Sequence, residues 1–295
     1  MIGHEVLKNQ TLVEKAEFSF TSKDLAVISK IMMSEAGIVL SEAKANLIYS
    51  RLAKRVRKLS MKGFSEYCAF VETPDGVEER RELIAALTTN VTRFFREPHH
   101  FEHLRSKLLP DLIGKAKAGH PVRLWSAACS SGQEPYSMAL TLLRELPDAL
   151  RYDIRILATD IDPNVLAVAQ AGIYSENALE PVPSNLKQSW FKSLQDDPGH
   201  WQAKEELRQI ISFRKLNLIG NWPMKGKFQA IFCRNVVIYF DNQTQENIWA
   251  RFVPVLDNNG ALYIGHSERV SGGAEQSFVS EGVTIYRKSL TGGSK

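Results

Sequence analysis

Apolar residues recur at helical intervals over the first third of the chain. One such stripe follows Asp24 and stops before Gly37, a residue suited to helix C-termini; it comprises Leu25, Ile28, Ile31 and Met32. A second stripe follows Ser41, a residue that can cap a helix, and comprises Ile48, Leu52, Val56 and Leu59. A last helical pattern covers residues 78–87. We therefore expect an N-terminal helical domain at residues 21–87, preceded by a flexible N-terminus at residues 1–20.

Beyond position 99, short apolar runs alternate with helical patterns. The runs typical of buried strands are Val122–Trp125, Ile154–Thr159, Ala230–Cys233 and Ala261–Ile264. A final pair of strands within residues 278–287 includes an antiparallel edge strand. The alternation predicts an α/β domain with a mostly parallel sheet at residues 99–288, followed by a flexible tail at residues 289–295.

The alternation breaks between Ile173 and Phe213. This segment holds a charged run and several turn residues, and it contains two short strand-like pieces, near Trp190 and near Ile211; the turn residues are Pro181, Pro183, Pro198 and Gly199. A small inserted subdomain explains this pattern better than a crossover helix does. We expect a small inserted β subdomain at about residues 181–213.

Polar residues follow several of the predicted strands. Small residues at 126–132 lead from the first strand into a helix predicted to start at Pro135, and Asp160 ends the second strand. The turn holds a single glycine, Gly132, whereas the dinucleotide fingerprint needs three. An acidic side chain at the tip of the second strand is where nucleoside-binding α/β folds hold ribose hydroxyls. A nucleoside site and an ordinary strand-to-helix connection both remain open at this point.

The segment at residues 88–98 (TTNVTRFFREP) joins the two predicted domains. It is too polar for a core and too aromatic for a plain linker, so it reads either as a linker that contributes to the active site or as a packed interdomain connection. His99 and His103 have i,i+4 spacing, but the H-E-x-x-H glutamate and a third ligand are missing. We therefore expect surface histidines and no metal. Three separated cysteines without C-x-x-C pairing predict neither zinc nor a disulfide framework, and Cys129 lacks a neighbouring base.

The helix that follows Ser41 carries a second, basic stripe. No acidic residue occurs between Lys44 and Lys62, so i,i+4 ion pairs within the helix cannot be its purpose. A solvated face and a docking surface for an acidic macromolecule both fit. The candidate docking residues are Arg51, Lys54, Arg55, Lys58 and Lys62.

Composition narrows the classes of function. The chain is 44% hydrophobic and 24% charged with a net charge of +4, as expected of a globular protein and too weakly basic for general nucleic-acid binding. The first ten residues lack the apolar run of a signal peptide, and no run approaches the roughly 18 apolar residues that span a membrane. A cytoplasmic location is the expectation.

Five segments, in this order, resemble the chemotaxis receptor methyltransferase (CheR) family. They are NVTRFFREPHHF from Asn90, WSAACSSGQEPYSMA from Trp125, ATDIDPNVLAVAQAGIY from Ala158, FRKLNL from Phe213 and IFCRNVVIYFD from Ile231. The N-terminal RLAKRVRKL and FSEY also resemble that family's helical domain. The resemblance covers residues 24–287. Val91, Arg93 and Gln133 depart from the residues common in the family, so no role is assigned to them.

The resemblance implies a Rossmann-like, seven-stranded methyltransferase sheet with a helical N-terminal domain and an inserted β subdomain. It also implies S-adenosylmethionine as methyl donor, S-adenosylhomocysteine as product, and glutamates of membrane chemoreceptors as acceptors. The implied cofactor contacts are Asn90, Thr92, Arg96, Glu134, Asp160, Asn217, Leu218, Arg234 and Asn235. A receptor's C-terminal peptide could pair with a strand edge of the insert, and the basic stripe could dock an acidic receptor helix.

This chemistry needs positioning more than proton transfer. A glutamate carboxylate, with a reference pKa of about 4.3, is already ionised at neutral pH and can attack a sulfonium methyl group without a general base. Arg96 and Tyr239 are the candidate catalytic positioners of the acceptor. Two alternatives stay open: a methyltransferase acting on a nucleic acid or small molecule, and a cofactor-binding signalling adaptor without activity.

Overall fold

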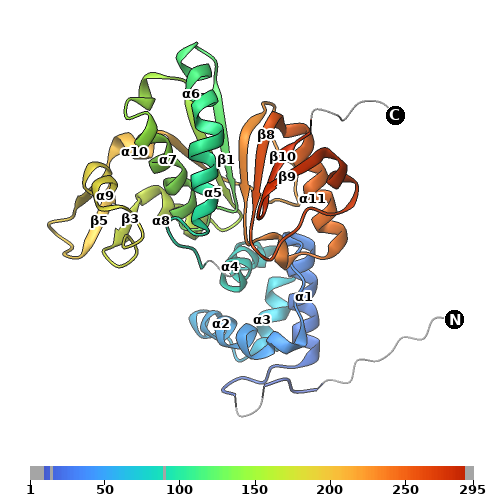
Figure 1. The fold of residues 1–295 in the computed structure, drawn as a ribbon. Coiled ribbons are helices and arrows are strands. Elements are labelled where there is room, and N and C mark those ends of the chain that lie inside the picture. Colours follow the sequence, from blue (N-terminus) through green and yellow to red (C-terminus); the bar gives the residue numbers. More distant parts are fainter. Residues whose placement is uncertain (1–9, 14–15, 89–90, 290–295) are drawn as a thin grey trace. The chain divides into compact units, whose positions relative to one another are not determined.

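The structure is a computed structural model that describes residues 10–13, 16–88 and 91–289 (Figure 1). Its contacts divide the chain into two compact units. Among the described residues, the helical unit comprises those up to position 88 together with Tyr239–Asp241, and the sheet unit comprises the remainder. Each unit has a hydrophobic core of its own, and each is described separately below.

The helical unit is built from α1 (Ser22–Ala36), α2 (Ala45–Lys58), α3 (Phe64–Val71) and α4 (Val77–Leu87), with short 3-10 turns η1 (Glu42–Lys44) and η2 (Pro74–Gly76). Thr21 and Asp24 form a capping box at the start of α1, and Gly37 ends the helix with φ +69°. The predicted Gly37 terminus is confirmed, whereas the helix begins two residues before Asp24, the predicted start.

The N-terminal stretch is more ordered than expected where the structure describes it. Phe20 is fully buried, and its ring centroid lies 4.7 Å from that of Phe64. The Phe18 amide donates to the Tyr49 hydroxyl, and Thr11 pairs with Thr21. The expected flexible N-terminus is therefore wrong for these residues, which complete the core of α1–α3. Residues 1–9, 14–15 and 290–295 lie outside the described part of the chain.

The sheet unit contains a seven-stranded sheet in the order β6-β2-β1-β7-β8-β10-β9. The strands are β1 (Val122–Ala127), β2 (Ile154–Asp160), β6 (Ile211–Lys215), β7 (Phe228–Cys233), β8 (Leu256–Ile264), β9 (Phe278–Gly282) and β10 (Ile285–Lys288). β6, β2, β1, β7 and β8 run parallel, and β10 runs against its neighbours β8 and β9. The predicted mostly parallel sheet with one antiparallel strand is confirmed.

Helices cover both faces of this sheet (Figure 1). One face is covered by α5 (Pro98–His103), α6 (Leu109–Lys117), α7 (Gln133–Glu145) and α8 (Pro163–Ala171), and a π turn joins α5 to α6. Leu124 of β1 lies in the core on this face. α11 (Asn242–Val255) covers the other face, where Trp125 lies 5.4 Å from Phe252. Because both faces are covered, the central parts of β1, β2 and β7 are largely buried on both faces rather than alternating between buried and exposed residues. α7 begins two residues before Pro135, the predicted first residue.

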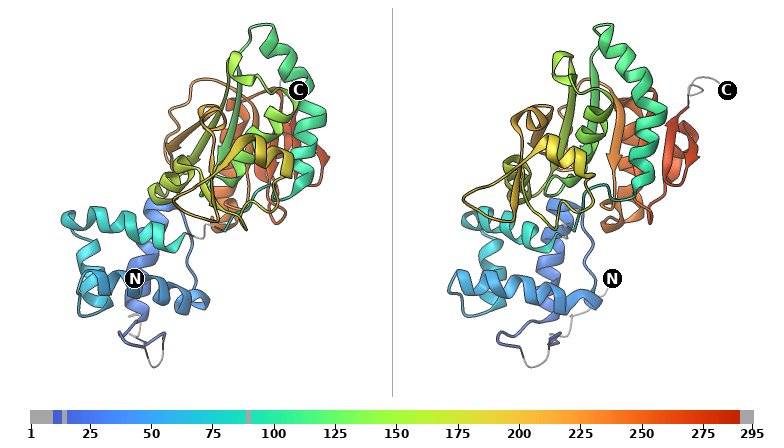
Figure 2. Two further views of the ribbon diagram at one scale, coloured as in Figure 1. Left: turned by 90° about the vertical axis from the view of Figure 1, so that its left-hand side faces the viewer. Right: turned by 60° about the vertical axis from the view of Figure 1, so that its left-hand side comes forward.

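The insert is a separate three-stranded antiparallel sheet in the order β3-β5-β4. Its elements are β3 (Ile173–Ser175), α9 (Ser184–Trp190), β4 (Phe191–Ser193) and β5 (His200–Ala203), and it packs against α7 (Figures 1 and 2). The predicted boundaries, about 181–213, are thus too late at both ends. The strand near Ile211 is β6 of the main sheet, where Ile211 lies opposite Ile156 of β2. A short apolar run does not reveal which sheet it joins.

Candidate active site

The sheet topology places four of the predicted site segments side by side, at the carboxyl ends of neighbouring strands. β6, β2, β1 and β7 are adjacent and parallel, so their carboxyl ends lie side by side. Asn217 and Leu218 follow β6, Asp160 ends β2, the turn at residues 128–132 follows β1, and Arg234 with Asn235 follows β7. Asn90, another predicted contact, lies outside the described residues.

The turn after β1 is tightly wound. Ala128 and Ser130 have φ values of +65° and +49°, and Gly132, at the start of α7, has φ +96°. A Cβ atom at Gly132 would lie only 2.7 Å from the Tyr174 hydroxyl oxygen. The Ser130 amide points at Asp160 and donates to Oδ2 over 2.8 Å. Gly132 therefore allows close packing against Tyr174, and the turn fixes the Asp160 carboxylate at the end of β2.

Asp160 is a buried carboxylate at the tip of β2. Its Oδ1 accepts from the Asp162 amide at 3.0 Å and its Oδ2 from the Ser130 amide. Burial raises the pKa of Asp160, and the backbone hydrogen bonds oppose this rise. A carboxylate has about four acceptor positions, so each oxygen can take a further donor, such as a ribose hydroxyl. The residue fits the predicted nucleoside contact.

Arg234 joins two carboxylates beside this turn. Its Nη1 lies 3.0 Å from Glu134 Oε2, and its Nη2 lies 3.3 Å from Glu97 Oε2 and donates to the Arg96 carbonyl. Ser126 Oγ donates to the other oxygen of Glu134 at 2.7 Å. Burial raises the pKa of Glu134, and Arg234 offsets part of that rise. The structure thus brings Arg96, Glu134 and Arg234 together through one buried guanidinium.

Glu268 is a site residue that sequence reasoning missed. Asn235, with φ +58°, starts the turn after β7, and Glu268 accepts the backbone amides of Gly265, Asn235, Val236 and Val237 over 2.6–3.0 Å. Burial raises the pKa of Glu268, and the four backbone hydrogen bonds oppose this rise. The carboxylate therefore shapes the loop that carries Arg234 and Asn235. Its sequence context, a polar GHSER stretch, gives no signal of this role.

The loop after β6 is organised by its own polar groups. Asn217 Oδ1 accepts from the Ile219 amide at 3.1 Å, and the Leu218 carbonyl accepts from Trp222 Nε1 and Arg251 Nη1. The Arg251 guanidinium lies 4.0 Å from the centroid of the Trp222 ring. Arg251 and Trp222, which the sequence pattern did not single out, thus hold the backbone of the predicted contact Leu218.

The two predicted catalytic positioners fall in different units. Arg96 is half-buried in the sheet unit, and its Nη1 donates to the Val91 carbonyl at 3.1 Å; Thr92 nearby is also half-buried. Tyr239 groups with the helical unit, where its carbonyl accepts from the Val39 amide and its ring lies 6.0 Å from Lys44 Nζ. The catalytic roles of both residues stay predictions.

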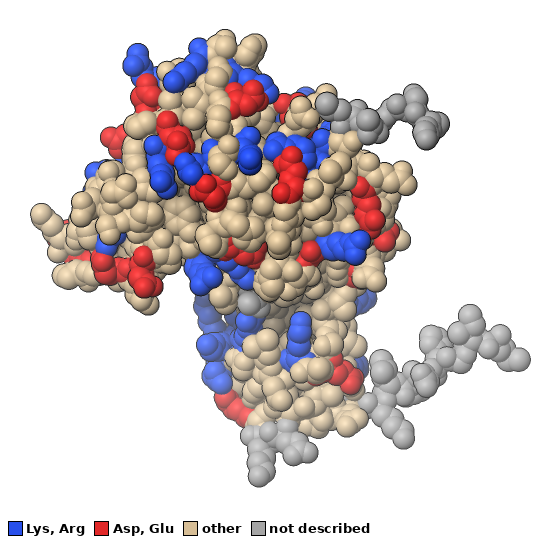
Figure 3. Space-filling model, in the orientation of Figure 1, with Lys and Arg blue, Asp and Glu red and all other residues tan. Residues whose placement is uncertain are grey.

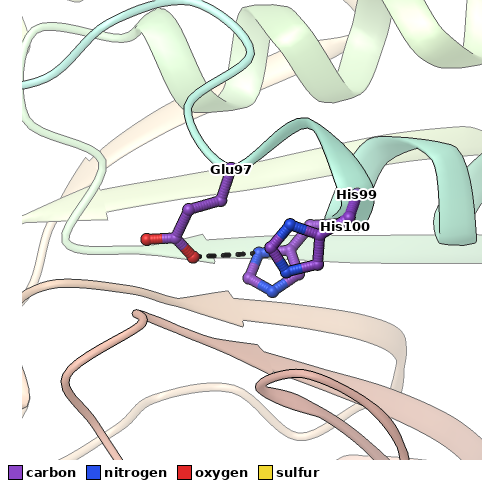
Figure 4. Close-up of side chains that lie close together, drawn as sticks. All are labelled: Glu97, His99 and His100. Carbon is purple, nitrogen blue, oxygen red and sulfur yellow. Dashed lines mark ion pairs between the residues drawn. The ribbon is translucent and has the colours of Figure 1, made fainter.

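The expected surface histidines are in part buried. His100 is fully buried, and His103 contacts the Tyr263 hydroxyl at 3.0 Å and Glu281 at 3.2 Å, whereas His99 is exposed. Glu97, His99 and His100 place one ligand atom each within 4.8 Å of one another (Figure 4). Burial and the Arg234 charge lower the pKa of His100 to about 3. The positive charge of Arg234 disfavours a protonated His100, and it would disfavour a bound metal cation for the same reason. We therefore assign no metal to this cluster.

The three cysteines are buried thiols. Burial raises the pKa of Cys129 and of Cys233 well above the ordinary value. A protonated, enclosed thiol is a poor nucleophile, which agrees with the expectation that Cys129 is not catalytic.

The basic stripe divides into bound and exposed cations. Arg55 pairs with Glu79 at 2.6 Å and Glu82 at 2.7 Å, and Arg51 donates to three carbonyls at the end of α4. Lys54, Lys58 and Lys62 are exposed, and Figure 3 shows Lys and Arg side chains gathered on the α2 side of the helical unit. The reading of Arg51 and Arg55 as free docking cations is therefore corrected: both tie α2 to α4.

A parallel sheet with carboxylates and a small-residue turn at its carboxyl edge defines a nucleoside-binding α/β protein. Comparison with known proteins sharpens this class. Residues 90–287 match the CheR methyltransferase SAM binding domain, and residues 23–88 match the CheR methyltransferase all-alpha domain. The chain belongs to the CheR methyltransferase family.

Relatives in several bacteria cover most of the chain. A probable chemotaxis protein methyltransferase of Rhizobium etli is 52% identical over 89% of this chain and 98% of its own length. Chemotaxis protein methyltransferase 2 of Pseudomonas aeruginosa is 42% identical (85% and 88%), and the Escherichia coli chemotaxis protein methyltransferase is 40% identical (88% and 88%). The protein is an S-adenosylmethionine-dependent methyltransferase of chemotaxis, which confirms the predicted activity and cofactor. Within the described residues, no helix is long and apolar enough to cross a membrane.

Proposed function

We propose that the protein methylates glutamate side chains of chemoreceptors, giving glutamate methyl esters. The observation that carries this proposal is the contact between Arg96 and Arg234, the residue that follows β7: the Arg96 carbonyl accepts a hydrogen bond from the Arg234 guanidinium. A guanidinium suits the recognition of a carboxylate acceptor. An ionised acceptor needs orientation and dehydration rather than a base.

The sheet edge supplies the groups that hold the cofactor. Asp160 would accept the ribose hydroxyls, and Asn217, Leu218 and Asn235, with Asn90, Thr92 and Arg96, would surround the nucleoside and its amino-acid tail. Glu134 and Asp160 add negative charge suited to a cationic cofactor. S-adenosylmethionine, when bound, supplies a methyl group on a positively charged sulfur.

Arg96 would hold one oxygen of the acceptor glutamate and leave the other free to attack. A grip on both oxygens would reduce nucleophilicity, so we assign a single contact, either to the acceptor or to the carboxylate of the cofactor. Tyr239 would donate its hydroxyl to the acceptor as a second positioner. The residues around Arg96 contribute by fixing its peptide rather than by moving protons.

The receptor would be recognised by charge and by strand pairing. Lys54, Lys58 and Lys62 form an exposed basic row that suits a glutamate-rich receptor helix, and Arg51 and Arg55 support α2, the helix that carries Lys54 and Lys58. In the inserted sheet, β3 and β4 each pair only with β5 among the described strands, so each has an edge that could accept a receptor's C-terminal peptide.

Arg96→Ala tests the proposal directly. With labelled S-adenosylmethionine and receptor-containing membranes, the wild type should leave base-labile label in protein, and Arg96→Ala should lower turnover more than about tenfold. Arg93→Ala is the matched control, because Arg93 is exposed in the same segment and should keep wild-type turnover.

Two other results would contradict this function. Base-stable label in RNA or a small molecule would favour another acceptor, and cofactor binding without transfer would favour an adaptor. If Arg96→Ala methylates receptors at the wild-type rate, Arg96 is not the positioner.

A further inference from the structure

A chain of buried polar contacts runs from the β9–β10 hairpin to the start of α7 through Glu97. His100 Nε2 lies 2.9 Å from Thr284 Oγ1, and His100 Nδ1 lies 3.5 Å from Glu97 Oε2 (Figure 4). The same Glu97 oxygen lies 3.3 Å from Arg234, which reaches Glu134. We call these residues (Thr284, His100, Glu97, Arg234 and Glu134) the Glu97 network. The sequence analysis selected only its last two members.

The network holds the backbone on either side of Arg96 in a strained form. Phe95 and Glu97 have φ values of +51° and +56°, a region that side chains with a Cβ atom rarely adopt. The Phe95 amide donates to Ser137 Oγ at 2.9 Å, and the Arg96 carbonyl accepts from Arg234. On the far side, the Glu97 side chain contacts Arg234, His100 and His266. These contacts hold a conformation that the chain would not keep alone.

His100 can serve this purpose as a neutral donor. Burial and the Arg234 charge lower its pKa to about 3, so the ring carries one N–H proton. Glu97 Oε2 and His100 Nδ1 are both buried, and neither has a hydrogen-bond partner in the described structure. If the proton sits on Nδ1, it points to Glu97 Oε2, while Nε2 faces the oxygen of Thr284, whose hydroxyl donates to the Val283 carbonyl at 2.7 Å. This tautomer gives the Nδ1 proton an acceptor in Glu97.

We propose that Glu97, oriented by His100, is a positioning residue that sets the place of the Arg96 side chain. The inference rests on the proposed function, because it assigns Glu97 a role only through Arg96. Glu97 touches neither substrate nor cofactor in this scheme. Its effect on turnover should therefore vanish when Arg96 is absent.

A double-mutant cycle in the full-length enzyme tests this dependence. Glu97→Gln keeps the shape of the side chain but removes its charge, and it should lower turnover on receptor membranes at least about tenfold, since a misplacement of about 1 Å can cost 10²-fold. In an Arg96→Ala background the same change should alter turnover less than about twofold. Glu102→Gln is the control on α5, because Glu102 is exposed and pairs with Arg105; its turnover should match the wild type.

Melting temperatures and circular dichroism establish that each variant is folded. If Glu97→Gln does not fold, His100→Phe takes its place in the cycle, because the phenyl ring can keep the ring contacts with Tyr263 and Phe232 while both nitrogens are lost. The same pattern is expected: a loss of turnover with Arg96 present and little change without it.

Two outcomes overturn the inference while leaving the proposed function intact. Glu97→Gln could turn over like the wild type although Arg96→Ala is slow, or it could lower turnover equally in both backgrounds, which is the signature of a structural role. If Arg96→Ala itself turns over normally, the proposed role of Arg96 fails, and the inference falls with it.

Discussion

Arg234 lies between two carboxylates from distant segments of the chain, and its side chain is only 2% exposed. Buried charges are tolerated when partners surround them, and here Glu97, Glu134 and the Arg96 carbonyl do so. Glu268 follows the same rule with four backbone amides. At the scale of single residues, the site is therefore a set of buried ions that fix loop conformations.

We expect Glu268→Gln to lower both the stability of the protein and its affinity for the cofactor product. A glutamine presents an NH2 group where the carboxylate accepts two amides, so we expect the free energy of unfolding to fall by about 1–3 kcal/mol. Affinity for S-adenosylhomocysteine should also weaken, because the Arg234–Asn235 loop loses its support. Urea unfolding and calorimetry measure the two effects. Glu275→Gln, at an exposed position, is the control; equal behaviour of the two variants would contradict the assignment.

The helix α2 combines two tasks on neighbouring faces. Arg55 faces α4, where its hydrogen bond to Glu79 raises the pKa of the guanidinium, and Tyr67 donates to the same carboxylate. Lys54 and Lys58 stay in solvent. At the scale of elements, one run of cations thus contains both Arg55, which ties α2 to α4, and the exposed residues Lys54 and Lys58.

Charge reversal separates these tasks. Lys54→Glu with Lys58→Glu should leave the melting temperature unchanged, slow receptor methylation at low salt, and flatten its dependence on ionic strength. Arg55→Glu should instead cost about 3–5 kcal/mol of stability, because Glu79 would be buried without its cation. Lys30→Glu on α1 is the surface control. Unchanged rate and salt dependence in the double variant would make the row a solvated face.

At the scale of the whole molecule, the two units carry different probes. Each of the five tryptophans lies in the sheet unit, at positions 125, 190, 201, 222 and 249. Tryptophan fluorescence therefore follows the unfolding of that unit alone.

S-adenosylhomocysteine should stabilise this fluorescence transition. At a concentration of 100 times its Kd, a ligand that binds only the folded unit adds about 2.7 kcal/mol. Asp160→Ala should remove most of this ligand-induced shift, because the ribose loses its acceptor. Denaturant titrations with and without ligand provide the measurement. An equal shift in both proteins would exclude Asp160 from the cofactor site.

Local patterns were sufficient for much of the fold. The helix that follows Asp24, its Gly37 terminus and the apolar strands of the parallel sheet were readable because they depend on neighbouring residues and on burial of both sheet faces. The resemblance then located the segments at the sheet edge. The C-terminal limit of the insert was misplaced because the strand at Ile211 lies next to the insert in the sequence, and only its pairing with β2 decides which sheet it joins.

The amino-acid sequence by itself determined which segments become helices and strands, and which polar residues follow the strands. Tertiary structure alone decided the partners: Glu79 for Arg55, Glu97 and Glu134 for Arg234, four amides for Glu268, and a hydrophobic core for Phe20. The physical reason is that the sequence specifies the charge of each side chain, whereas the group that neutralises this charge belongs to a distant segment that only folding brings near. The support around Arg96 belongs to this second kind.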